Sequence, residues 1–123
     1  MKLYLAHASS YDYQTELYEP LKQTIARQHQ IVFPHDEFIV NTRETILASD
    51  LVVAEVTHAS TGEGIELGWA SAGNIPIVCL FKIGTSYSSS LPFVSDTFIG
   101  YSSTSDMVAK LSSWLAEYGD VAR

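Results

Sequence analysis

The chain has 123 residues, of which 46% are hydrophobic, and a formal net charge of −7 at pH 7. This length predicts one domain over residues 1–123, and the apolar share is ample for one core. The negative charge disfavours a nucleic-acid polymer or an anionic membrane as a partner. No apolar stretch approaches the roughly 20 residues that span a bilayer, and the N-terminus lacks a signal-peptide pattern. We therefore expect a soluble, cytoplasmic domain.

Apolar runs and turn residues predict strands that alternate with helices along the chain. The expected strands are residues 2–6, 31–33, 51–55, 75–81 and 97–101. The expected helices are residues 13–28, 41–48, 61–72 and 106–118. Pro20 would mark a start or a kink within the first helix. Asn41 or Thr42 would cap the second helix, and Gly73 with Asn74 would end the third.

Strands that alternate with helices favour a parallel sheet with right-handed crossover connections. Five such units in this length predict an α/β fold, a flavodoxin-like three-layer sandwich with a five-stranded parallel sheet. In that strand order the first and third strands are neighbours, at the point where ligands bind. The loops after these strands, residues 7–11 and 56–64, should therefore line one crevice.

The turn between the third strand and the third helix is the most informative part of the chain. Ser60 and Glu63 have the spacing of a capping box, so Glu63 is expected to be a capping residue. Gly62 and Gly64 lack Cβ atoms and would let a ligand approach the backbone. Glu66 follows in the first two helical turns, where the helix dipole favours an ionised carboxylate by roughly 0.3–1 kcal/mol. Such a carboxylate suits nucleophilic attack, but Glu is also common at helix starts, and spacing alone leaves both interpretations open.

The stretch DLVVAEVTHASTGEGIELGWA resembles the signature of the nucleoside deoxyribosyltransferase superfamily. It is most similar to the branch of small N-glycosidases that act on deoxynucleoside monophosphates. In that family a strand of the type DVVVAEV leads to G-x-G-x-E-L-G, and the Glu is the nucleophile. The resemblance implies that Glu66 is the nucleophile and that Tyr4, on the first strand, orients it. No metal-ligand spacing appears in the chain, so we expect neither a metal nor another cofactor.

The resemblance also implies a site for the phosphate of the substrate. The family positions that hold it fall on Ser60 and on Ser90, and in the family the latter serine comes from the partner subunit of a homodimer. Ser60 is equally well placed as a helix cap, and Ser90 lies in a serine-rich loop where a chance match is easy. Ser9 and Ser10 would add hydroxyl donors. Because no Arg or Lys is placed to help, we expect a homodimer with only a moderate preference for a nucleoside monophosphate over the free nucleoside.

One family residue has no counterpart in this chain. The Asp that assists the leaving base falls on Thr42, which is no general acid. The loop after the second strand carries His35 and Asp36, so we expect leaving-group assistance from one of them. Asp36 is accordingly taken as a catalytic residue and His35 as a substrate contact, although both are also common turn residues.

Two classes of function remain open at this point. The first is an N-glycosidase or deoxyribosyltransferase whose partner is a small-molecule nucleoside or nucleotide. The second is a catalytically inactive nucleotide-binding module on the same fold, which the missing Asp favours. A phosphate-recognising regulatory domain, similar to flavodoxin-like receivers, is a third possibility. It requires an exposed Asp at the end of the third strand, where this chain has Glu55.

Overall fold

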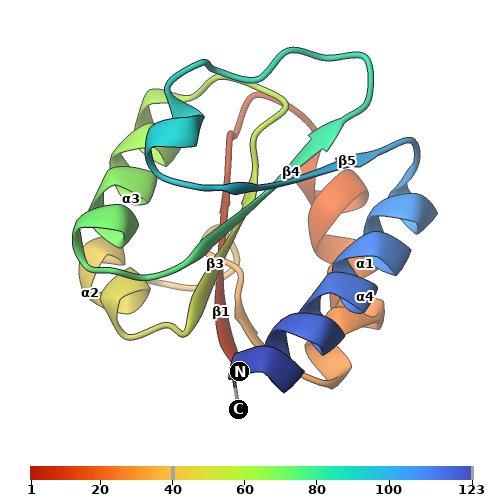
Figure 1. Cartoon of the computed structure of the whole chain (residues 1–123), viewed down its shortest axis with the longest axis horizontal. Coiled ribbons are helices and arrows are strands. Elements are labelled where there is room, and N and C mark those ends of the chain that lie inside the picture. The colour runs from red at the N-terminus through yellow and green to blue at the C-terminus, as the bar shows by residue number, and fades with distance from the viewer. Residues whose placement is uncertain (40, 123) are drawn as a thin grey trace.

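A five-stranded sheet forms the centre of the computed structural model, which describes residues 1–39 and 41–122. Its strands are β1 (Lys2–His7), β2 (Gln30–Val32), β3 (Leu51–Glu55), β4 (Ile77–Lys82) and β5 (Thr97–Tyr101). The strand order is β2-β1-β3-β4-β5, and every neighbouring pair is parallel (Figure 1). This arrangement confirms the predicted flavodoxin-like α/β fold, with β1 and β3 side by side.

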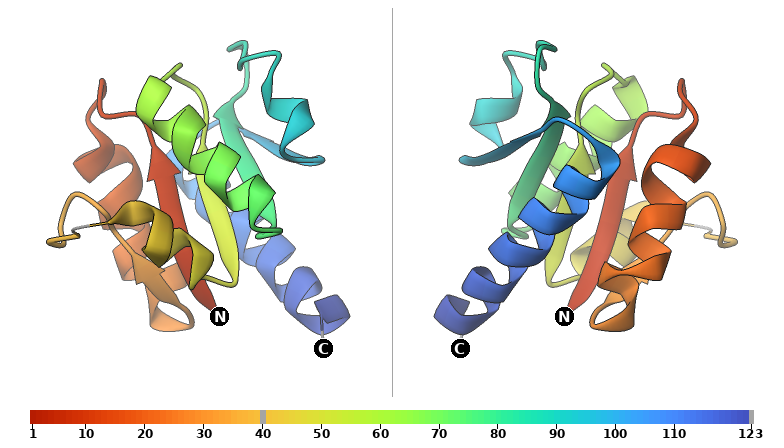
Figure 2. Two further views of the ribbon diagram at one scale, coloured as in Figure 1. Left: turned by 90° about the vertical axis from the view of Figure 1, so that its left-hand side faces the viewer. Right: turned by 90° about the vertical axis from the view of Figure 1, so that its right-hand side faces the viewer.

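Helices cover both faces of the sheet. They are α1 (Glu19–Gln23), α2 (Thr42–Leu47), α3 (Thr61–Ala72) and α4 (Thr104–Ala122). Figures 1 and 2 show α2 and α3 on one face and α1 and α4 on the other. Because successive strand side chains point to opposite faces, β1 supplies both cores: Leu3 and Leu5 join the α1/α4 side, and Tyr4 and Ala6 the α2/α3 side. Among the helices that the structure describes, none is both long and apolar enough to cross a bilayer.

The first predicted helix is not continuous, and that expectation was wrong. A π-helical turn over Gln14–Tyr18 leads into α1, and a 3₁₀ turn follows over Ile25–Arg27. Pro20 explains the irregular start, because proline has no N–H to donate to the preceding turn. Instead the Glu19 N–H bonds to the oxygen of Gln14, five residues back. Pro20 thus lies in the first turn of α1, as the sequence predicted.

The ends of α2 and α3 are set by the residues that the sequence indicated. Asn41 caps α2 through its side-chain oxygen. Ser60 caps α3, since its Oγ accepts a hydrogen bond from the Glu63 N–H at 3.3 Å. At the other end, α3 stops at Gly73 and Asn74 takes a left-handed conformation, with φ of 59°. Because α3 follows β3 after the short loop 56–60, its N-terminus lies at the carboxyl edge of the sheet, beside the ends of β1 and β3.

Candidate active site

The loops after β1 and β3 meet at the carboxyl edge of the sheet. The ring of Tyr11, from the first loop, stacks on the ring of His58, from the second, with centroids 4.7 Å apart. This contact agrees with the crevice expected from the strand order. In open parallel sheets, ligands bind at this edge and at this point of the strand order.

Glu66 lies in the second turn of α3, half-buried and facing β1. The hydroxyl of the buried Tyr4 donates a hydrogen bond to Glu66 Oε2 at 2.5 Å. Burial raises the pKa of Glu66, while hydrogen bonds from Tyr4 and Thr42 and the nearby His35 oppose that shift. Burial and the Glu66 carboxylate raise the pKa of Tyr4, so its hydroxyl stays a proton donor. The pair predicted from the sequence therefore forms one hydrogen-bonded unit.

Tyr4 and Glu66 open onto a pocket of about 200 Å³ between β1, α2 and the loop after β2. Its lining residues are Tyr4, His7, Pro34, His35, Glu37, Ile39, Thr42 and Glu66. Thr42, the position where the family has its Asp, thus lies beside the proposed nucleophile. The pocket is large enough for a sugar or a base. Of its two lining carboxylates, Glu66 is oriented by Tyr4, and Glu37 accepts a hydrogen bond from the Phe33 N–H at 2.9 Å.

A buried hydrogen-bond network supports the floor of this pocket. His7 Nδ1 donates to the oxygen of Ala8 at 2.8 Å, which leaves Nε2 to accept from the Tyr18 hydroxyl at 2.6 Å. The Tyr18 oxygen accepts in turn from the backbone N–H of His35 at 3.1 Å. Burial lowers the pKa of His7 and keeps its ring neutral. Sequence spacing does not signal this network, because Tyr18 comes from the turn before α1 and His35 from the loop after β2.

The structure argues against Asp36 as a proton donor. Its carboxylate forms an ion pair with Lys22 and accepts a hydrogen bond from Gln14 Nε2 at 2.9 Å. The hydrogen bonds from Lys22 and Gln14 lower the pKa of Asp36. Asp36 is absent from the lining of the Glu66 pocket, whereas its neighbour His35 lines it. An ionised, paired carboxylate outside the pocket has no proton to give to a leaving group.

Ser60 and Ser90 come together in a second pocket, of about 430 Å³, between the start of α3 and the segment before β5. Gly64 and Glu63 also line it, whereas Gly62 does not. Ser9 and Ser10 are exposed and line neither this pocket nor the Glu66 pocket. The two serines singled out for phosphate are therefore neighbours within one chain.

Ser60 has a structural role that is separable from any contact with substrate. Ser60→Ala should destabilise the fold by about 1 kcal/mol, because α3 loses its cap. Ser90→Ala is the matched control: Ser90 is exposed in the same pocket, and its change should leave stability unaltered. Urea unfolding followed by circular dichroism measures both values. Equal stability of the two variants would contradict the capping role.

The sequence predicted a capping role for Glu63, and the structure gives that role to its N–H rather than to its side chain. Its N–H bonds to Ser60, but its side chain is buried, and the residue is 5% exposed. Among the described residues, its buried Oε2 has no hydrogen-bond partner. Burial, with the nearby Glu55 and Glu66, raises the pKa of Glu63 to about 9. At pH 7 the carboxyl is therefore neutral.

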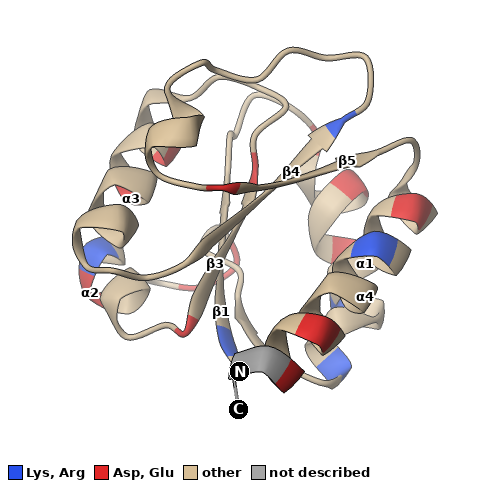
Figure 3. Cartoon of the chain, viewed as in Figure 1, with Lys and Arg blue, Asp and Glu red and all other residues tan. Residues whose placement is uncertain are grey.

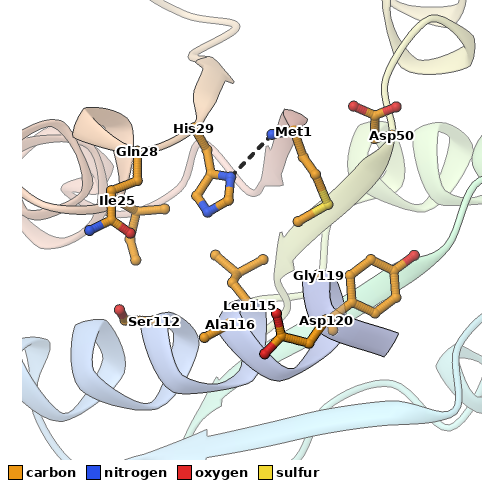
Figure 4. A pocket seen from close by; sticks show the side chains of 11 residues that line it. Met1, Ile25, Gln28, His29, Asp50, Ser112, Leu115, Ala116, Gly119 and Asp120 are labelled. Carbon is orange, nitrogen blue, oxygen red and sulfur yellow. Dashed lines mark hydrogen bonds between the residues drawn. The ribbon is translucent and has the colours of Figure 1, made fainter. Parts of the chain in front are cut away.

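A larger pocket, of about 730 Å³, lies at the opposite edge of the sheet (Figure 4). There the Met1 amino group contacts His29 Nδ1 at 3.3 Å. The Asp50 carboxylate accepts a hydrogen bond from the backbone N–H of Lys2. Ligands of open parallel sheets bind at the carboxyl edge, so we do not take this pocket as the site. Within the described residues, no three His, Cys, Asp or Glu side chains are grouped to hold a metal ion.

Fold and site together define a flavodoxin-like α/β protein with a tyrosine-bound carboxylate at the switch point of the sheet. Solved structures support the fold. The CMP N-glycosidase of Clostridium botulinum superposes with a TM-score of 0.67 over 91% of this chain and 99% of that one, at 21% identity. A conserved protein from Enterococcus faecalis V583 has a TM-score of 0.64 over 92% of this chain and 98% of that one, at 19% identity. At these identities the likeness shows the fold.

The chain is also similar in sequence to curated proteins, although no family model matches it. A Syntrophotalea carbinolica protein named "Putative 2'-deoxynucleoside 5'-phosphate N-hydrolase 1" is 41% identical over 75 residues, 58% of this chain and 53% of that protein. The 5-hydroxymethyl-dUMP N-hydrolase of Rattus norvegicus is 41% identical over 64 residues, 52% of this chain and 36% of that protein. The match thus spans about half, or less, of these curated relatives. Together the similarities confirm the resemblance to the nucleoside deoxyribosyltransferase superfamily.

Proposed function

We propose that this protein cleaves the N-glycosidic bond of a nucleoside or nucleoside monophosphate, with Glu66 as the nucleophile. The observation that carries the proposal is the 2.5 Å hydrogen bond from Tyr4 to Glu66, in a pocket at the switch point of the sheet. The names of the relatives, which are N-hydrolases and an N-glycosidase of nucleotides, support the type of bond.

The residues suit a double displacement at C1′ of the sugar. Cleavage of the bond to the base develops oxocarbenium character, and a carboxylate oxygen of Glu66 captures C1′ as an ester. Tyr4 fixes the orientation of that carboxylate and stays protonated. Attack by water on C1′ then gives hydrolysis and frees Glu66, whereas attack by a second base would give transfer. The sequence indicated His35 or Asp36 as the residue that assists the leaving base. Of the two, His35 lines the same pocket as Glu66 and is the candidate that we retain.

The proposal extends to a homodimer in the cytoplasm, as expected from the sequence. Support for the dimer comes from the segment that follows Ser90, where Phe93 is 88% exposed. Such an aromatic side chain is typical of an interface core. Sedimentation at working concentration tests this part independently of the chemistry.

The acid limb of the pH–rate profile tests the Tyr4–Glu66 unit. The nucleophile must be ionised, so activity is lost as pH falls through the pKa of Glu66. The hydrogen bond from Tyr4 lowers that pKa, and Tyr4→Phe should therefore move the acid limb of kcat/KM to higher pH and reduce the maximum rate. Tyr101→Phe is the matched control, since Tyr101 is another buried tyrosine that bonds to a carboxylate, Glu55. An acid limb that stays in place in Tyr4→Phe would remove Tyr4 from the mechanism.

Thr42 favours the second candidate, an inactive nucleotide-binding module. It lines the same pocket as Glu66, at the position where the family Asp assists the base. Release of free base from a panel of nucleosides and 5′-monophosphates, followed by chromatography, separates the two candidates. Binding of panel members without release of base would establish the module and overturn the enzyme.

A further inference from the structure

The ring of His35 lines the Glu66 pocket, and two tyrosines that lie outside this lining fix its position. The Tyr13 hydroxyl is 3.2 Å from His35 Nδ1. The backbone N–H of His35 donates a hydrogen bond to the Tyr18 oxygen at 3.1 Å. Among the described residues, none bonds to His35 Nε2. One ring nitrogen of His35 is therefore occupied, and the other is free to contact a ligand, since the residue is exposed.

Tyr13 is itself fixed by its surroundings. Its backbone N–H donates to the oxygen of Tyr11 at 2.8 Å, just before the π-helical turn. Its half-buried ring packs against the rings of His7 and Tyr18, with centroids 4.6 and 5.0 Å away. The His35 ring lies 4.9 Å from that of Tyr13 and 5.0 Å from that of His7, which is neutral because burial lowers its pKa. Four rings from three segments of the chain thus give the Tyr13 hydroxyl a defined position.

A tyrosine hydroxyl suits a histidine that gives up a proton and later regains it. In the imidazolium both ring nitrogens carry a proton, and the Tyr13 oxygen accepts a hydrogen bond from Nδ1–H of His35. After Nε2 has lost its proton, Nδ1–H remains bonded to Tyr13, and the lone pair on Nε2 is able to accept a proton. The ring therefore keeps one orientation through both steps, and all proton exchange takes place at Nε2.

A positive charge on His35 meets carboxylates rather than other cations in this pocket. Glu66 interacts with it electrostatically, and so does Asp36, which is also paired with Lys22. Glu37, from the same loop as His35, lines the pocket as well. No Lys or Arg is among the described lining residues, and α3 has acidic positions but no basic one (Figure 3). The surroundings are therefore compatible with an imidazolium next to the proposed nucleophile.

We propose that Tyr13 is a positioning residue, whose hydroxyl holds Nδ1 of His35 so that Nε2 gives a proton to the leaving base. The inference rests on the proposed function, which supplies the substrate and the nucleophile. As Glu66 forms the ester bond to C1′, the electron pair of the C1′–N bond goes to the base, and the base takes the Nε2 proton. Water then attacks C1′, the ester electron pair returns to Glu66, and a proton of the water restores Nε2–H. The pair supplies the acid that Thr42, in the same pocket, does not provide.

The dependence of the rate on the leaving base tests the inference, because a base that departs without a proton does not need His35. For a purine substrate the activated analogue carries 7-methylguanine, which is released as a neutral molecule. For a pyrimidine substrate it carries 5-fluorouracil, whose anion is more stable than that of uracil. On the ordinary substrate, His35→Ala should lower kcat by about 10²-fold, the value of general acid catalysis, and Tyr13→Phe by about tenfold, the value of one hydrogen bond. On the analogue both losses should be much smaller.

Tyr118→Phe is the matched control, since Tyr118 is another half-buried tyrosine in an aromatic pair, at the opposite edge of the sheet. Its rates on both substrates should be unchanged. Equal losses on the ordinary substrate and the analogue in Tyr13→Phe would indicate a structural role and overturn the inference, and so would full activity of Tyr13→Phe on the ordinary substrate. No base release by the unaltered protein would defeat the proposed function and the inference with it, whereas equal losses in an active enzyme defeat the inference alone.

Discussion

Replacing Glu66 with Gln should abolish base release, lowering kcat/KM by on the order of 10⁴-fold or more, as expected when a nucleophile is removed. Gln keeps the size of the side chain and an oxygen to accept the hydrogen bond from Tyr4, so the fold should be unaffected. The amide is too weak a nucleophile to capture C1′. The measurement is the rate of free-base release from the best substrate of the panel. At substrate concentrations well below KM this rate gives kcat/KM.

Glu44→Gln is the matched control for this experiment. Glu44 is an exposed residue of α2, on the same face of the sheet, and its replacement should leave the rate unchanged. Circular dichroism and the thermal midpoint establish that all three proteins are folded. Retention of full activity by Glu66→Gln would exclude Glu66 as the nucleophile. This conclusion would not depend on the roles of the other site residues.

Replacing Glu63 with Gln should change how the free energy of unfolding depends on pH. Burial raises the folded-state pKa of Glu63 from 4.5 to about 9, so between these values only the folded protein holds the proton. The stability that this proton contributes is complete below the unfolded pKa and is lost as pH rises, by up to about 1.4 kcal/mol per pH unit. The Gln variant has no such loss. Its stability relative to the unaltered protein should therefore increase steadily from about pH 5 to about pH 8.

Urea unfolding curves at several pH values measure this difference. The slope of the stability difference against pH is more informative than its value at one pH. The buried amide of the Gln variant has a packing cost of its own, and that cost does not vary with pH. Glu44→Gln, at its exposed position, should show a difference that does not vary with pH. Parallel stability profiles for Glu63→Gln and the unaltered protein would mean that Glu63 is ionised in the folded state.

The sequence determined the architecture because each element carries its own local signals. The apolar run that begins at Leu51, with β-branched Val52 and Val53, predicted β3 with the bounds that the structure has. The Ser60 cap and the Gly73 stop did the same for α3. The alternation of strands and helices then led to the parallel sheet and to the adjacency of β1 and β3. That adjacency, with the family motif, predicted the contact between Tyr4 and Glu66 that the structure has.

Only the tertiary structure decided the pKa shifts of Asp36 and Glu63. Asp36 is paired with Lys22, fourteen residues earlier, because the loop after β2 packs against α1. Glu63 has the spacing of a capping-box residue, yet its side chain is buried near the end of β3. Local spacing predicts which backbone groups a side chain reaches, and it therefore located the caps. The pKa of a carboxyl depends on the burial and the charges that distant segments bring to it, and these are known only once the chain has folded.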